Sequence, residues 1–572
     1  MGAHALGDSE RHPSSNRVAF ALAVLFTLGA ASVFIAGALH AGPVVWADAC
    51  GYLSAAQVVA ERHQYGHSLI QLNVLMLPDP PEIDRVGWWP PGYPVAIALA
   101  SGMRADDPAR MIAAAHALDL ISQLLAAAGF GVLAGIASRN RTAGVLTAGL
   151  YLLSVPIIHE IPRLQSEHLY MPLLAWALVL HLSAARKPRA ATIAGAAVLW
   201  ALAGLTRHVA IVAAGCAGLA VIASAWRERD RWRRIGVGLI PTFACWAGAA
   251  AWVARNTAVA GRARDHLEPG PDPYVPQIFE TVWAYLLGLS GPPLAPSALP
   301  RMRDMIVLAG GGLLTVALIT LIVVTMQRRR EQRDPAWHWL AVFAATFIPL
   351  TLAMLVYASV NQRINTLFGR YVSPTTAITV VLLIAGAAQL RTLRAPVVLL
   401  AICIAAGGLL QGVTNLLLPN AWEKMADLRE LHDSPAVREA VRGQALLLTA
   451  RDGPRPAVDL VPAAVFLPEA RTIYWLDNPQ YSGVTLTGDD IARLAREGTF
   501  SLILRGPEQR LVAEWGHEES RLALLRRGIS EALIDEQLAE IDYLREFTVH
   551  PPWETEVVAR AGEWTIERVV PQ

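Results

Sequence analysis

Long apolar runs recur along this chain and restrict its fold more than any other feature. A helix needs about 20 apolar residues to cross a bilayer. Eleven runs have roughly that length, at residues 18–40, 111–136, 142–158, 166–184, 190–205, 208–225, 235–255, 303–325, 338–358, 371–389 and 396–417. They predict a mainly α, polytopic membrane protein of about eleven transmembrane helices.

The composition agrees with a membrane protein. Of the 572 residues, 54% are hydrophobic and 17% are charged, whereas soluble proteins carry about 25% charged residues. The formal net charge of +1 argues against bulk binding of nucleic acid. The 4 cysteines have neither metal-site nor disulfide-framework spacing.

Clusters of arginine predict which side of the membrane each connection faces. In the even-numbered connections they lie at residues 139–141, 186–189, 227–234, 328–333 and 391–394. Cytoplasmic loops carry an excess of Lys and Arg, so these connections and the N-terminus are expected in the cytoplasm. Joining the runs at 190–205 and 208–225 would move the last three clusters to the opposite side. We expect a multi-pass protein of the inner (cell) membrane.

Two domains are expected. Residues 1–417 would form the transmembrane domain, with an outer loop at 41–110 that holds amphipathic stretches at 52–64 and 94–103. In residues 418–572, short apolar runs alternate with helical patterns, which predicts a small extracytoplasmic α/β domain. The apolar runs are 445–449, 464–467, 472–476 and 500–504, and the helical patterns are 489–497 and 508–527.

Two acidic residues are expected at the outer rim of the membrane. Asp48 follows the first apolar run, four residues before Tyr52, and Glu167 opens the fourth run. A carboxylate near hydrocarbon marks chemistry, an ion path or a structural pair. Two carboxylates on one rim can hold a divalent cation such as Mg or Mn, or divide base and positioning roles. The simpler interpretations are a helix cap for Asp48 and a dipole interaction for Glu167.

Arginines at the ends of spans are expected on the same side, against the cytoplasmic bias. They are Arg207, Arg255, Arg363 and Arg370. A guanidinium binds phosphate through a planar fork of donors, and a lipid phosphate is the natural partner at that depth. The alternative is that these side chains only snorkel to the interface.

The outer loop also contains a rigid aromatic turn. It reads Trp88-Trp89-Pro90-Pro91-Gly92-Tyr93-Pro94. Prolines restrict the backbone, and aromatic side chains favour the headgroup level of a bilayer. An interfacial anchor is the simplest function for this turn.

In this order, the motifs resemble those of the GT-C glycosyltransferases, within residues 18–390. The resemblance is to the branch that uses polyprenyl-phosphate sugars, which includes aminoarabinose transferases of lipid A, lipopolysaccharide-core sugar transferases and protein O-mannosyltransferases. Many relatives have an Asp-Glu pair in the first loop, whereas Ala49 follows Asp48 here. The motifs are the acidic first loop, Trp-Pro-Pro-Gly-Tyr-Pro, Ser166-Glu167, Leu205-Thr206-Arg207, Trp252-x-x-Arg255-Asn256 and Gly369-Arg370-Tyr371-x-x-Pro374.

The resemblance implies a membrane glycosyltransferase that moves a sugar from a polyprenyl-phosphate donor to an extracytoplasmic lipid, glycan or protein, with inversion. It implies that Asp48 and Glu167 are catalytic and hold any metal ion. Donor phosphate would be bound by Arg207, Arg255, Arg370 and Tyr371, and substrates would be positioned by Tyr52, Trp89, Tyr93, His168 and Arg363.

Two other classes of protein are possible from the sequence. A transporter or lipid flippase would also bury charges, but near the bilayer midplane on broken helices. Here the charged residues are expected at one rim. A scaffold whose working part is the tail would need only one span as its anchor, whereas eleven are expected.

Overall fold

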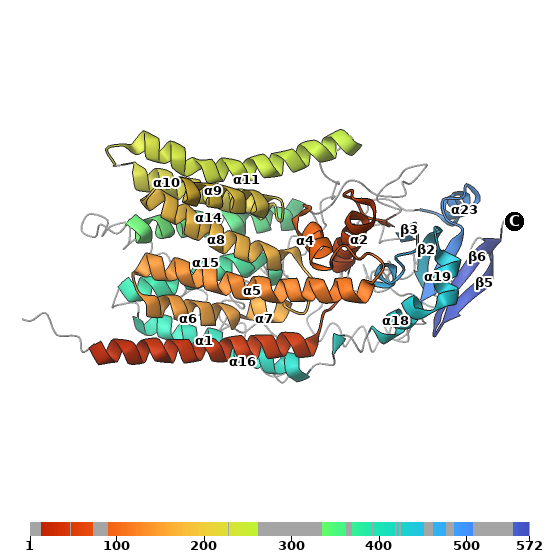
Figure 1. Ribbon diagram of the computed structural model, residues 1–572, viewed down its shortest axis with the longest axis horizontal. Helices are drawn as coiled ribbons and strands as arrows, with labels where there is room; N and C mark the ends of the chain where they lie inside the picture. The colour runs from red at the N-terminus through yellow and green to blue at the C-terminus, as the bar shows by residue number, and fades with distance from the viewer. Residues whose placement is uncertain are drawn as a thin grey trace, which may run out of the picture.

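The computed structural model describes residues 13–45, 47–71, 90–226, 228–260, 335–361, 369–389, 394–417, 420–421, 425–450, 462–475, 486–506 and 553–570. Long helices run side by side in a bundle, and a sheet lies beyond one end of it (Figure 1). The predicted fold class, a mainly α membrane protein with a smaller α/β part, is confirmed.

Seven helices in the described ranges are long and apolar enough to cross a membrane. They are α1 (Pro13–Ala41), α5 (Pro108–Ser138), α8 (Ser166–Arg186), α11 (Arg231–Ala260), α14 (Pro335–Asn361), α15 (Gly369–Gln389) and α16 (Arg394–Leu417). The shorter apolar helices α9 (Ala190–Gly204) and α10 (Val209–Ala225) match two further predicted runs. The run at 303–325 lies outside the described residues.

The run at 142–158 forms two helices, so its prediction as a single span was wrong. The helices are α6 (Arg141–Leu152) and α7 (Val155–Glu160). Ser154 between them has an extended backbone, with φ −68° and ψ 130°. Pro156 follows in the first turn of α7, where its missing N–H is tolerated.

Two short helices lie between the bundle and the sheet (Figure 1). They are α2 (Ala47–Arg62) and α4 (Gly92–Ala100), and they match the two predicted amphipathic stretches. Tyr52 of α2 and Tyr93 of α4 belong to one buried apolar cluster, which also contains Phe466 of the tail. The first loop and the tail are therefore packed around one core.

Within the described residues the sheet has six strands, in the order β1-β3-β2-β4-β6-β5. The strands are β1 (Leu69–Gln71), β2 (Ala445–Ala450), β3 (Thr472–Trp475), β4 (Leu502–Gly506), β5 (Glu554–Ala561) and β6 (Trp564–Val570). β1 comes from the first loop and pairs in parallel with β3. The tail alone does not supply every strand of its sheet.

The tail contributes four helices in its described part. They are α18 (Ala426–Asp433), α19 (Pro435–Val441), α21 (Pro462–Val465) and α23 (Gly488–Arg496). The apolar run at 464–467 belongs to α21 and the turn after it, so this run is not one of the strands of the sheet. The helical pattern at 508–527 lies outside the described residues.

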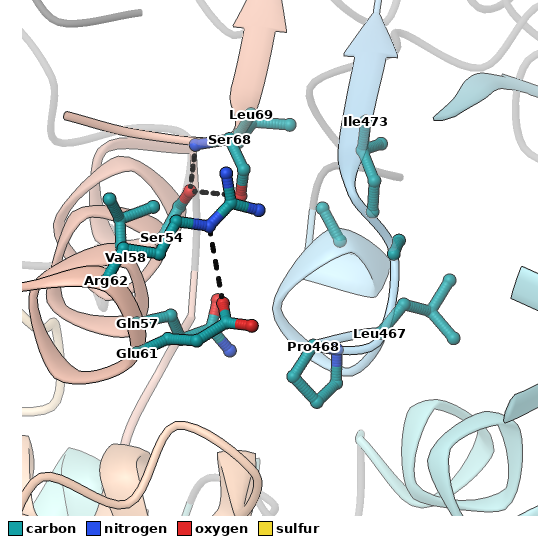
Figure 2. Close-up of a pocket in the computed structure, with 12 residues that line it drawn as sticks. Ser54, Gln57, Val58, Glu61, Arg62, Ser68, Leu69, Leu467, Pro468 and Ile473 are labelled. Carbon is teal, nitrogen blue, oxygen red and sulfur yellow. Dashed lines mark hydrogen bonds and ion pairs between the residues drawn. The ribbon is translucent and has the colours of Figure 1, made fainter. Parts of the chain in front are cut away.

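A polar seam joins α2 to the tail. Gln57 Nε2 donates to the carbonyl oxygen of Val465 at 2.9 Å, and Arg62 Nη2 donates to that of Arg471 at 3.4 Å. Figure 2 shows the small pocket along this seam, with the polar side chains of α2 facing Leu467 and Pro468. The seam holds the C-terminal half of α2, the helix whose first turn carries Asp48.

Candidate active site

Four charged side chains from separate segments meet at the sheet end of the bundle. Asp48 Oδ2 pairs with Arg370 Nη1, and Arg370 Nε lies 4.0 Å from Glu167 Oε1. Arg207 Nη2 lies 2.7 Å from the same Glu167 oxygen. We call these four residues the charge cluster. Two carboxylates alternate with two guanidiniums in it, so their formal charges balance.

Local structure explains how each side chain reaches the cluster. Asp48, Glu167 and Arg370 lie in the first turns of α2, α8 and α15. Acidic side chains are favourable there because of the helix dipole. Arg207 lies in the short turn between α9 and α10.

The members of the charge cluster differ in exposure. The side chains are 6% exposed for Glu167, 9% for Arg370 and 19% for Arg207, whereas Asp48 is 29% exposed. Asp48 is therefore the charged group of the cluster that an incoming molecule can reach most easily. A buried charge is tolerated only when it is paired, so the other three depend on one another.

Tyr371 lies against both guanidiniums. Its hydroxyl accepts from Arg370 Nη2 at 3.0 Å, and its ring centroid is 4.8 Å from the Arg370 guanidinium carbon and 5.8 Å from that of Arg207. Burial disfavours the charged form of Arg207, but the Glu167 carboxylate outweighs it and keeps the pKa of Arg207 above its ordinary value. Both arginines are cations at any physiological pH.

Ser166 links the cluster to α2. Its hydroxyl donates to Glu167 Oε2 at 3.3 Å and accepts from Arg207 Nη1 at 3.3 Å. Tyr52 OH lies 3.0 Å from the hydroxyl oxygen of Ser166. Burial, then the charge of Glu167, raises the pKa of Tyr52, so its hydroxyl stays protonated and can donate. Tyr52 is buried and acts on the cluster through Ser166.

Tyr93 is also buried, and it points at a residue that the sequence analysis missed. Its hydroxyl donates to Asp119 Oδ2 at 2.8 Å. Its ring meets the Tyr52 ring edge to face, with centroids 5.1 Å apart. Asp119 lies inside the predicted span at 111–136, and an ionisable residue within a span was the signal that could have found it.

His168 fixes the loop that precedes Glu167. Its Nε2 lies 3.1 Å from the carbonyl oxygens of both Glu160 and Arg163, which can only accept, so Nε2 carries the proton. Its Nδ1 then accepts from Gln123 Nε2 at 2.8 Å. Gln123 in turn accepts from Tyr151 OH. No pattern in the sequence indicated this supporting network.

Arg255 belongs to a different set of contacts. Its Nη2 donates to the carbonyl oxygen of Tyr65 at 2.9 Å, and its guanidinium carbon is 5.1 Å from the centre of the Trp252 ring. It joins the end of α11 to the loop after α2. The structure groups Arg207 with Arg370, and it shows Arg255 in contact with Tyr65 and Trp252. Trp89 and Arg363 lie outside the described residues.

The expected metal site fits the described residues poorly. A cation held by both Asp48 and Glu167 would meet the guanidinium of Arg370, which already pairs with both carboxylates. Within the described ranges, no three His, Cys, Asp or Glu side chains gather into a group that could hold a metal ion. The guanidinium donors of Arg207 and Arg370 favour an anion instead.

Known proteins resemble this chain in fold. No family model and no curated protein matches it. One solved structure, ArnT from Cupriavidus metallidurans bound to undecaprenyl phosphate, has a TM-score of 0.51 and 14% identity, over 95% of this chain and 97% of that one. The structure of ArnT from the same organism in the apo state has a TM-score of 0.53 and 14% identity, over 97% of this chain and 99% of that one. The chain therefore shares the fold of these ArnT structures over nearly its whole length.

Proposed function

We propose that this chain is a glycosyltransferase of the inner membrane that moves a sugar from polyprenyl phosphate to an extracytoplasmic lipid, glycan or protein. The charge cluster is the observation that carries the proposal. It places the most exposed carboxylate of the cluster beside two less exposed arginines at one end of a membrane bundle. The likeness to an ArnT structure bound to undecaprenyl phosphate supports a lipid-linked donor.

In this proposal, Arg207, Arg370 and Tyr371 bind the donor phosphate. The bond between the anomeric carbon and the phosphate oxygen breaks, and negative charge grows on the departing phosphate. Fixed guanidiniums stabilise that charge in a site with little water. Tyr371 holds Arg370 in place through its hydroxyl.

Asp48 accepts the proton of the acceptor hydroxyl. The acceptor oxygen attacks the anomeric carbon from the face opposite the phosphate, so the configuration inverts. Arg370 pairs with Asp48, so the base and the phosphate-binding guanidinium lie side by side. Glu167 is more buried and paired with Arg207, so it has a positioning role.

Transfer by the purified full chain tests this proposal. We expect radiolabelled sugar to move from undecaprenyl or decaprenyl phosphate to one member of a panel of lipid, glycan and protein acceptors. Asp48→Asn keeps an oxygen that can pair with Arg370 but loses the base, so transfer should fall at least about 100-fold. Asp106→Asn is the matched control, because that carboxylate is exposed and pairs with Arg104. If Asp48→Asn transferred sugar at the wild-type rate, Asp48 would only cap its helix and would not be the base.

A further inference from the structure

A buried carboxyl group lies behind the charge cluster and takes no part in the proposed chemistry. Asp119 on α5 is 0% exposed. Its Oδ2 accepts from Tyr93 OH at 2.8 Å, and within the described residues its Oδ1 has no hydrogen-bond partner. A carboxyl group without partners is costly to bury. The hydrogen bond from Tyr93 on α4 is therefore the contact of Asp119 that offsets the cost of burying it.

The helix that Asp119 contacts, α4, packs against residues next to two members of the charge cluster. At its start, the Gly92 amide donates to the carbonyl oxygen of Leu205 at 2.8 Å, next to Arg207. A Cβ at Gly92 would lie 2.5 Å from Thr206 Oγ1, so the approach is as close as the backbone allows. On its other side, Tyr93 packs edge to face on Tyr52 of α2, the helix that begins beside Asp48.

We infer that Asp119 is a positioning residue that anchors α4 through Tyr93 and so sets Arg207 and Asp48 in their relative places. The packing part of this inference depends only on the contacts of Asp119, Tyr93 and Gly92. Its consequence for catalysis rests on the proposed function.

Cys50 provides a reporter that does not need activity. It is wholly buried on α2, two residues after Asp48, in the same apolar cluster as Tyr93. Burial, then the charge of Asp48, raises the pKa of the Cys50 thiol, so it should react slowly with a maleimide. The other cysteines, Cys216, Cys245 and Cys403, are replaced by alanine in this experiment.

Loss of the hydrogen bond between Asp119 and Tyr93 should loosen the packing of α4 against α2 and expose Cys50. In Asp119→Leu and in Tyr93→Phe, we expect Cys50 to react about tenfold faster. Asp119→Asn keeps an oxygen that can accept from Tyr93 and should react as the wild type does. Thr147→Val is the matched control, because it removes a buried hydroxyl from α6. Unchanged Cys50 reactivity in both Asp119→Leu and Tyr93→Phe overturns the inference.

Kinetics separate positioning from general packing. Per folded molecule, Asp119→Leu and Tyr93→Phe should lower kcat by about tenfold and raise the donor KM, with rescue by Asp119→Asn. If Cys50 reacts faster in the variants but kcat and KM stay at wild-type values, the positioning role is wrong. If the wild type transfers no sugar while Cys50 still reacts faster in the variants, the proposed function is wrong, but Asp119 still holds α4 in place.

Discussion

At the scale of residues, Arg370 is the centre of the candidate site. Its guanidinium contacts Asp48 and Glu167, and it also donates to Tyr371. Removing one member of a buried ion pair leaves a charge without compensation, which is more harmful than losing the pair itself. Substitutions that keep the shape, such as amide for carboxylate, therefore report on chemistry better than alanine does.

Loss of an arginine should weaken donor binding selectively. We expect Arg207→Ala and Arg370→Ala to raise the apparent dissociation constant of the polyprenyl-phosphate sugar about 10- to 150-fold, the loss of a charge-assisted bond worth about 1.5–3 kcal/mol. Lysine should rescue only in part because it lacks the planar fork. The measurement is donor titration at fixed acceptor concentration.

Arg255→Ala serves as the matched comparison for those variants. Because Arg255 stacks on Trp252 and donates to the Tyr65 carbonyl, its loss should change donor affinity less than about threefold. A large effect at Arg255 together with none at Arg207 or Arg370 would move the donor site to the end of α11.

Metal removal tests the remaining expectation from the sequence. Since Arg370 occupies both carboxylates, transfer should persist after treatment with a chelator and should not rise when Mg or Mn is added back. Loss of transfer on chelation, with recovery on addition of one cation, would instead show that a metal ion displaces Arg370 from Asp48 and Glu167.

At the scale of elements, α4 is the part of the site with the least space. We expect Gly92→Ala to push α4 away from Leu205 and Thr206, because the new Cβ would lie within 3 Å of both. Arg207 in the same turn should shift, and transfer should fall at least about tenfold while the helical circular dichroism stays unchanged.

The control for Gly92→Ala is Gly29→Ala in α1, where nothing lies within 4 Å of the new Cβ. That variant should keep full activity, and it should gain slightly in stability because alanine favours a helix. Full activity in Gly92→Ala would show that α4 can move without disturbing Arg207.

At the scale of the whole molecule, the sheet marks one end of the bundle (Figure 1). We expect that end outside the cytoplasm. With the native cysteines removed, Arg442→Cys and Glu497→Cys in the tail should react with an impermeant maleimide on intact spheroplasts. Lys187→Cys, which follows the C-terminal end of α8, should react only after permeabilisation. The reverse pattern would place the charge cluster on the cytoplasmic side.

Much of the architecture was readable from the sequence because it depends on local patterns. Apolar runs of sufficient length predicted the spans, and the amphipathic stretches predicted α2 and α4. The prediction failed where a break was subtle, at Ser154 and Pro156, because the apolar character continues through the turn between α6 and α7.

The sequence alone also placed Asp48, Glu167, Arg207 and Arg370 near one end of the spans, since each position depends only on where a helix begins or ends. Only the tertiary structure decided their partners. Asp48 and Arg370 are 322 residues apart in the chain. β1 pairs with a strand of the distant tail, where Leu69 lies opposite Ile473. The contact of Asp119 with Tyr93 and that of Arg255 with Tyr65 were decided in the same way. Such contacts depend on how helices pack against one another, and local periodicity carries no information about that packing.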